Sequence, residues 1–222
     1  FDGVFHHNRL VLPALRRGGV QPGDVVAILG AGPIGMLVAQ WARVLGAGRV
    51  LLVDVDAHRL GLARELGLGE TYDAVDGDTV AWAMAQTEGR GPDLVVEAAG
   101  VPATVEQALR MARPLGRVIL LGNPSGDLLL AQATMSQVLR KQLVIKGTWN
   151  SSFVSLPVDE WRVVLEMQAV GRIDMGAMIS HKVPLREGLE ALEMMRHRRE
   201  PFMRVVLLGD ATARSAKEGA RR

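Results

Sequence analysis

Short apolar runs alternate with helical stripes along most of the chain. The runs are four or five residues long and rich in β-branched residues, which is typical of strands buried on both faces of a sheet. Between them, apolar residues recur at helical spacing, as Ile34, Leu37 and Val38 do after the first run. We expect strands at residues 25–29, 50–54, 72–75, 93–97, 117–121 and 143–147.

Six short strands separated by helices require crossover connections, which make the strands parallel and the crossovers right-handed. The sequence therefore predicts an α/β fold with a doubly wound, parallel, six-stranded sheet. We expect this domain to span residues 21–155. Residues 1–20 form a short segment, which we interpret as an entry segment with little core. Residues 156–222 are expected to form helices and a return strand, and both ends resemble remnants of a second lobe.

One uncharged stretch, residues 25–42, approaches the length of a membrane span. Gly30, Gly32 and Pro33 interrupt its middle and would leave backbone groups unpaired in a bilayer. A strand, a turn and a helix explain this stretch better, so we expect no membrane segment.

Composition narrows the function classes. The 222 residues are 48% hydrophobic and 23% charged, which is ordinary for a folded domain. The absence of cysteine excludes disulfides, thiolate metal sites and a catalytic cysteine. With 26 basic and 24 acidic residues, nothing indicates nucleic acid as a partner. The chain starts without methionine or a signal-peptide pattern, so we interpret it as processed or truncated and expect a cytoplasmic location.

The clearest indication of a binding site is the turn after the first strand, where Gly-Ala-Gly-Pro-Ile-Gly fits the G-x-G-x-x-G pattern. Gly30 is expected to make the tight turn, Gly32 to let a pyrophosphate approach the backbone, and Gly35 to bring the helix close to the strand. Free N–H groups and the helix dipole would face the phosphates. Asp54 ends the next strand and would accept hydrogen bonds from both adenosine ribose hydroxyls while repelling the 2′-phosphate of NADP. This Rossmann arrangement predicts NAD binding.

The chain resembles the medium-chain dehydrogenase/reductase superfamily, and within it the zinc-type polyol branch of sorbitol and galactitol-1-phosphate dehydrogenases. The resemblance runs from about residue 16 to residue 208. It is carried by residues 17–26 with the glycine turn, 54–60, Glu97-Ala98-Ala99-Gly100, 143–150 and 180–185.

The resemblance implies which residues contact the cofactor. It assigns the pyrophosphate to Gly30, Gly32, Pro33, Ile34 and Gly35, the adenosine to Asp54, Arg59 and Ala99, the nicotinamide ribose to Leu121, Gly122 and Asn123, and the carboxamide to backbone groups of Thr148, Trp149 and Asn150. Two alternatives stay open. Arg59 would otherwise be a solvated helix residue, and Glu97 a strand-end carboxylate paired with a nearby arginine.

In this family a preceding lobe supplies a catalytic zinc, but we identify no zinc ligands and no catalytic residues in this chain. His6 and His7 are adjacent, so on a strand they would point to opposite faces. We interpret His58 as solvent-facing, His181 as structural and His197 as part of a solvated basic face.

We therefore interpret the chain as the NAD-binding portion of an alcohol or polyol dehydrogenase, inactive alone for lack of the zinc lobe. The complete enzyme would transfer hydride between a secondary alcohol, such as a polyol or polyol phosphate, and nicotinamide. The alternatives are a non-catalytic nucleotide-binding module and a zinc-free NAD(P)H reductase of the same superfamily. Because an open apolar strand invites pairing, we place the sixth strand at a sheet edge and expect a homo-oligomer.

Overall fold

The computed structural model describes residues 11–75, 77–148 and 160–209. Contacts between Cα atoms divide the chain into two compact units. Of the described residues, those up to Ile173 belong to one unit and those from Asp174 onward belong to the other.

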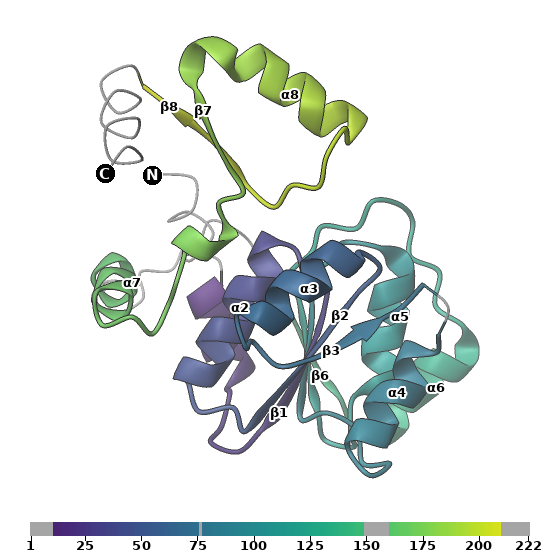
Figure 1. The fold of residues 1–222 in the computed structure, drawn as a ribbon. Helices are drawn as coiled ribbons and strands as arrows, with labels where there is room; N and C mark the ends of the chain where they lie inside the picture. The colour runs from purple at the N-terminus through teal and green to yellow at the C-terminus, as the bar shows by residue number, and fades with distance from the viewer. Residues whose placement is uncertain (1–10, 76, 149–159, 210–222) are drawn as a thin grey trace. The chain divides into compact units, whose positions relative to one another are not determined.

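The first unit is built on a six-stranded sheet in which every pairing is parallel (Figure 1). Its strands are β1 (Val25–Leu29), β2 (Arg49–Asp54), β3 (Glu70–Asp73), β4 (Leu94–Glu97), β5 (Arg117–Leu120) and β6 (Val144–Gly147). The spatial order β3-β2-β1-β4-β5-β6 confirms the doubly wound α/β fold and places β6 at an edge. The chain reverses its direction of travel across the sheet between β1 and β4, which is where such sheets bind ligands.

Helices cover both faces of this sheet. They are α2 (Pro33–Val44), α3 (Ala57–Glu65), α4 (Thr79–Gln86), α5 (Pro102–Met111) and α6 (Gln132–Lys141), and α7 (Glu160–Ala169) belongs to the same unit. In Figure 1, α2 and α3 lie on one side of the sheet and α4, α5 and α6 on the other. The uncharged stretch of residues 25–42 is thus a strand, a turn and a helix. No helix in the described parts of the chain has the length and apolar character to cross a membrane.

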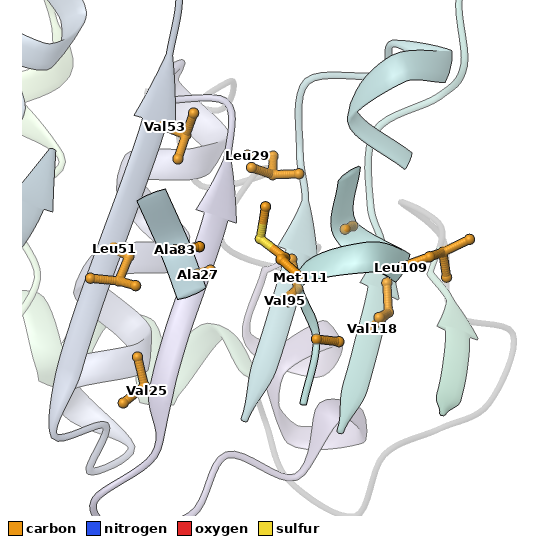
Figure 2. Packing of buried hydrophobic residues seen from close by; sticks show 12 residues of the cluster. Val25, Ala27, Leu29, Leu51, Val53, Ala83, Val95, Leu109, Met111 and Val118 are labelled. Atoms are coloured by element: carbon orange, nitrogen blue, oxygen red, sulfur yellow. The ribbon is translucent and has the colours of Figure 1, made fainter. Parts of the chain in front are cut away.

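The core follows the alternation of side chains along β1. Val25, Ala27 and Leu29 belong to the buried cluster under α4 and α5 (Figure 2). Val26 and Ile28 point to the opposite face, where α2 packs. All five side chains are buried because helices cover both faces, which explains why β1 reads as a continuous apolar run.

The described part of the predicted entry segment, residues 11–20, contributes to the core, which we had not expected. Residues 11–18 are helical, and Val11, Leu12 and Leu15 are fully buried. Their i, i+1, i+4 spacing forms a short apolar stripe along one face of the helix. The end of this helix is fixed to the sheet, because Arg117 of β5 donates to the carbonyl groups of Gly18 and Gly19.

The predicted elements agree with the observed ones except at β3, which begins at Glu70 rather than at Tyr72. Its sequence, Glu-Thr-Tyr-Asp, has only one apolar residue. An edge strand can be this polar because it is only partly covered, and none of its four side chains is buried. The apolar pattern therefore placed the predicted strand too close to Val75, which follows the observed strand and is 60% exposed.

The second unit holds a small β-α-β arrangement. Strands β7 (His181–Pro184) and β8 (Val205–Leu208) pair in parallel, and α8 (Gly188–His197) connects them. Two short 3-10 turns, η1 (Gly176–Met178) and η2 (Leu185–Glu187), precede β7 and α8 respectively. Four methionines and one alanine form its buried side chains, namely Met175, Met178, Ala191, Met194 and Met203.

Candidate cofactor-binding site

The turn between β1 and α2 has a backbone that requires glycine at two positions. Gly30 has a φ of +104°, and a Cβ there would come within 2.9 Å of the Ala99 backbone nitrogen. A Cβ on Gly35 would overlap the carbonyl oxygen of Gly30. The N–H of Gly30 donates to the carbonyl of Val53 at 2.7 Å, which ties the turn to β2. These contacts hold α2 close against the end of β1.

The space beside the Cα atom of Gly32, by contrast, is free of close neighbours. Gly32 is the N-cap of α2, and the nearest atom to an added Cβ would be Nη1 of Arg59 at 4.0 Å. The first hydrogen bond of the helix runs from the Met36 N–H to the Gly32 carbonyl at 2.9 Å. The amides of Ile34 and Gly35 therefore precede the helical ladder at the positive end of the helix, where an anion is stabilised. Pro33 has no N–H to leave unpaired.

Asp54, the last residue of β2, points at this turn. Its Oδ2 accepts a hydrogen bond from the Ala31 amide at 2.6 Å. Its Oδ1 accepts from the amides of Val55 at 2.8 Å and Asp56 at 2.9 Å. A carboxylate has about four acceptor positions, so about one remains for a sugar hydroxyl. The amide of Ala31 is used by Asp54 and is therefore not among the groups free to face a phosphate.

Arg59 lies between two carboxylates at the start of α3. Its Nη1 is 3.7 Å from Oδ2 of Asp54, and its Nε is 3.4 Å from Oδ2 of Asp56. The side chain is 35% exposed, and Nε is buried without a hydrogen-bond partner. Arg59 is therefore not a purely solvated helix residue, since its guanidinium borders both Asp54 and the open side of Gly32.

The loops after β4 and β5 meet on the other side of the turn. Ala99 lies against Gly30, as the close approach of their backbones shows. The amides of Leu121 and Gly122 both donate to the carbonyl of Glu97 at 2.9 Å. A Cβ on Gly100 would come within 2.6 Å of the Asn123 carbonyl oxygen, so these two loops are in direct contact.

We considered an ion pair between Glu97 and a nearby arginine. No arginine in the described part of the chain pairs with Glu97. Its Oε1 instead accepts hydrogen bonds from the amides of Ala99 and Gly100, each at 2.9 Å, and from Oγ1 of Thr104 at 2.8 Å. Sequence reasoning missed Thr104. The available signal was a threonine in the first turn of a helix that follows a strand-end glutamate.

Thr148 follows β6 at the same end of the sheet. Its amide donates to the Leu120 carbonyl at 3.0 Å, and its Oγ1 is buried without a hydrogen-bond partner. Trp149 and Asn150 lie outside the described residues. The structure therefore brings together the residues after β1, β2, β4, β5 and β6 at the carboxyl edge of the sheet.

These residues fit a dinucleotide. The uncovered Gly32, the amides at the start of α2, the anchored Asp54 and the unpartnered Thr148 hydroxyl supply the contacts that a diphosphate, a ribose and a carboxamide require. The described residues do not fit zinc, since they contain no group of three or more His, Asp or Glu that could hold a metal ion. His6 and His7 lie outside the described residues. His58 is exposed, and His181 contacts Ser180 and Glu200.

Comparison with known proteins agrees with this geometry. The family model described as zinc-binding dehydrogenase matches residues 33–169. Galactitol 1-phosphate 5-dehydrogenase of Escherichia coli K12 is 33% identical over 157 residues, which cover 71% of this chain and 45% of that protein.

Two solved structures are similar over most of the chain. The crystal structure of Escherichia coli galactitol-1-phosphate dehydrogenase has a TM-score of 0.81 at 28% identity and covers 89% of this chain and 57% of that one. A structure from Sinorhizobium meliloti 1021, assigned to the zinc-binding dehydrogenases and bound to NADP, has a TM-score of 0.75 at 30% identity and covers 91% and 57%. The chain thus spans about half the length of the relatives it matches.

Proposed function

Since the chain belongs to the zinc-binding dehydrogenase family, we propose that it is the NAD-binding portion of an alcohol or polyol dehydrogenase. The observation that carries this proposal is the open Gly32 beside the anchored Asp54. The nicotinamide cofactor supplies hydride transfer when bound, and the residues of this chain bind and orient it.

The roles follow from position in the fold. Gly32 and the amides of Ile34 and Gly35 hold the diphosphate at the start of α2, where the helix dipole favours negative charge. Asp54 holds the adenosine ribose with its remaining acceptor position. The loops that contain Gly122 and Thr148 hold the nicotinamide half. Hydrogen bonds to backbone groups hold Asp54, Gly122 and Thr148 in place, so the cofactor would meet a preorganised surface there.

The cofactor preference is proposed as NAD over NADP. The Asp54 carboxylate cannot turn away from the ribose without losing three backbone hydrogen bonds, so its charge would repel a 2′-phosphate. NADP is the second candidate, because Arg59 lies within 3.7 Å of Asp54 and could pair with that phosphate, and the Sinorhizobium relative is bound to NADP.

The substrate proposal comes from the relatives. A polyol or polyol phosphate is proposed for the whole protein because the Escherichia coli relative is a galactitol 1-phosphate 5-dehydrogenase. The described residues offer no ligand set for zinc. The 222-residue chain alone is expected to show little or no oxidation of polyols.

Self-association is also proposed. Strand β6 lies at the edge of the sheet, and its Val144 and Ile145 are 45% and 41% exposed. An unpaired strand edge with apolar side chains is suited to pair with a second copy of the chain.

Isothermal titration of the purified chain with NAD and then with NADP tests the central proposal. We expect saturable binding of both and a lower Kd for NAD. Tighter binding of NADP would indicate that Arg59 pairs with the 2′-phosphate and that Asp54 does not select NAD. Rapid polyol oxidation by the chain alone would contradict its assignment as a cofactor-binding portion.

A further inference from the structure

Glu97, the last residue of β4, carries a fully buried carboxylate of which only one oxygen is hydrogen-bonded. Three donors converge on Oε1, namely the amides of Ala99 and Gly100 and the hydroxyl of Thr104. Oε2 is buried and has no hydrogen-bond partner. Oε1 thus acts as an acceptor toward all three groups, as a carboxylate oxygen can.

No positive side chain neutralises this charge within the described ranges. Asp93, which directly precedes the same strand, forms ion pairs with Arg90 and Arg113. Glu97 forms none with any described lysine, arginine or histidine, and its charge is offset only by backbone amides and the first turn of α5. A buried charge without a counterion acts over a longer range than a solvated one, because little water screens it.

The charge lies at the centre of the candidate site. In the sheet, Glu97 stands opposite Leu29 of β1 and Leu120 of β5, where the order of the strands reverses. A Cβ on Gly122 would come within 2.7 Å of Oε2, so the unpartnered oxygen faces the loop after β5 directly. This is the loop to which the proposed function assigns the nicotinamide half.

We propose that Glu97 sets the relative affinity of the site for the oxidised and the reduced cofactor, an inference that rests on the proposed function. The nicotinamide ring carries a positive charge when oxidised and none after it has accepted a hydride. A fixed negative charge beside the loop that holds the nicotinamide half would stabilise the oxidised form and would be neutral toward the reduced form. Glu97 is thus a specificity-determining residue for the redox state of the ligand.

The test compares two dissociation constants in the 222-residue chain. NADH binding is followed by its fluorescence, and NAD⁺ binding by displacement of NADH. In Glu97→Gln the amide oxygen can keep the three Oε1 hydrogen bonds while the charge is lost. The ratio Kd(NAD⁺)/Kd(NADH) should rise about tenfold over the wild-type ratio, as expected for two charges roughly 12 Å apart at an effective dielectric constant near 20.

Two variants of Thr104 separate charge from structure. Thr104→Val removes one donor to Oε1 but keeps the carboxylate, so its ratio should stay within about twofold of wild type. Thr104→Lys places an ammonium beside the carboxylate and should raise the ratio as Glu97→Gln does. This second neutralising variant decides the question if Glu97→Gln does not fold.

An unchanged ratio in Glu97→Gln, or in Thr104→Lys when the first variant is insoluble, would overturn the inference and leave the proposed function standing. Equal loss of affinity for both forms would assign Glu97 a purely structural role and would also overturn it. A wild-type chain that binds neither form would overturn the inference and the proposed function together.

Discussion

The Oδ2 atom of Asp54 lies 2.6 Å from the backbone nitrogen of Ala31 and accepts its hydrogen bond. This bond joins the end of β2 to the glycine turn after β1. The same side chain that is proposed to hold the ribose therefore also holds the turn proposed to bind the diphosphate. The proposed function therefore couples the binding of the two cofactor parts through one carboxylate.

Replacing Asp54 should accordingly affect both affinity and stability. Asp54→Asn loses a charged hydrogen-bond acceptor for the ribose, so NAD affinity should fall about 10- to 100-fold while NADP affinity falls less. Titration calorimetry with each cofactor measures the change. Asp78→Asn is the matched control, because Asp78 accepts from the amides of Val80 and Ala81 at the start of α4. Because asparagine caps a helix about as well as aspartate, this variant should keep nearly wild-type stability and wild-type NAD affinity. Equal effects of the two substitutions on NAD affinity would argue against the ribose role.

Substitutions at the second and third glycines of the motif should have different effects. Gly32→Ala has room for its Cβ in the ligand-free protein, so it should fold with nearly wild-type stability and bind NADH at least about tenfold more weakly. Gly35→Ala would overlap the Gly30 carbonyl and should lower stability by about 1–3 kcal/mol. Thermal unfolding and NADH titration give the two readouts.

Gly61→Ala is the control for these substitutions. Gly61 lies within α3, nothing lies within 4 Å of its added Cβ, and the change should raise stability by about 0.5–1 kcal/mol. Wild-type NADH affinity in Gly32→Ala would contradict the proposed approach of the diphosphate.

Asp93 should contribute to stability at neutral pH and lose that contribution in acid. Burial raises the pKa of Asp93, but hydrogen bonds from the Val25 amide and from Arg113 outweigh it, so the pKa lies below its ordinary value of 3.8. The stabilisation is present above that ordinary value and disappears as the pH falls through the lower folded-state value. Asp93→Asn should therefore flatten the acid limb of a plot of unfolding free energy against pH. Exposed Asp127→Asn should leave it unchanged, and equal acid limbs in wild type and Asp93→Asn would refute this account.

Strand β6 should mediate association of two copies. Light scattering at micromolar concentration should give at least twice the mass of one chain for the wild type and a single-chain mass for Ile145→Lys, because a charge on the edge strand opposes pairing. Val55→Lys, at an exposed residue that follows β2 on the other half of the sheet, should associate as the wild type does. A monomeric wild type would refute the β6 interface.

The sequence predicted the sheet well because most of its strands are buried on both faces, which leaves uninterrupted apolar runs such as Val25–Leu29. The sequence predicted less well those elements whose side chains are only partly buried or whose apolar pattern is short. The polar edge strand Glu70–Asp73 shows little apolar pattern, and the stripe in residues 11–18 is too short to stand out.

Within the candidate site, spacing indicated the glycines and Asp54, and the family resemblance implied the other residues, but neither predicted the hydrogen bonds between them. The glycines and Asp54 follow from a local pattern, whereas the Asp54–Ala31 hydrogen bond depends on how β1 and β2 pair. The surroundings of Glu97 depend on the approach of Gly122 from β5, which no local pattern encodes. The arginine partner that we considered for Glu97 was wrong for this reason.

The most direct test of the central claim is a titration of the wild-type chain with NADH, followed by energy transfer from tryptophan to the dihydronicotinamide. Trp41 is buried in α2, the helix whose first turn is proposed to hold the diphosphate. The account predicts a saturable transfer signal in the wild type that NAD⁺ displaces and that Gly32→Ala weakens. Absence of any transfer at millimolar NADH in the folded wild-type chain would contradict it.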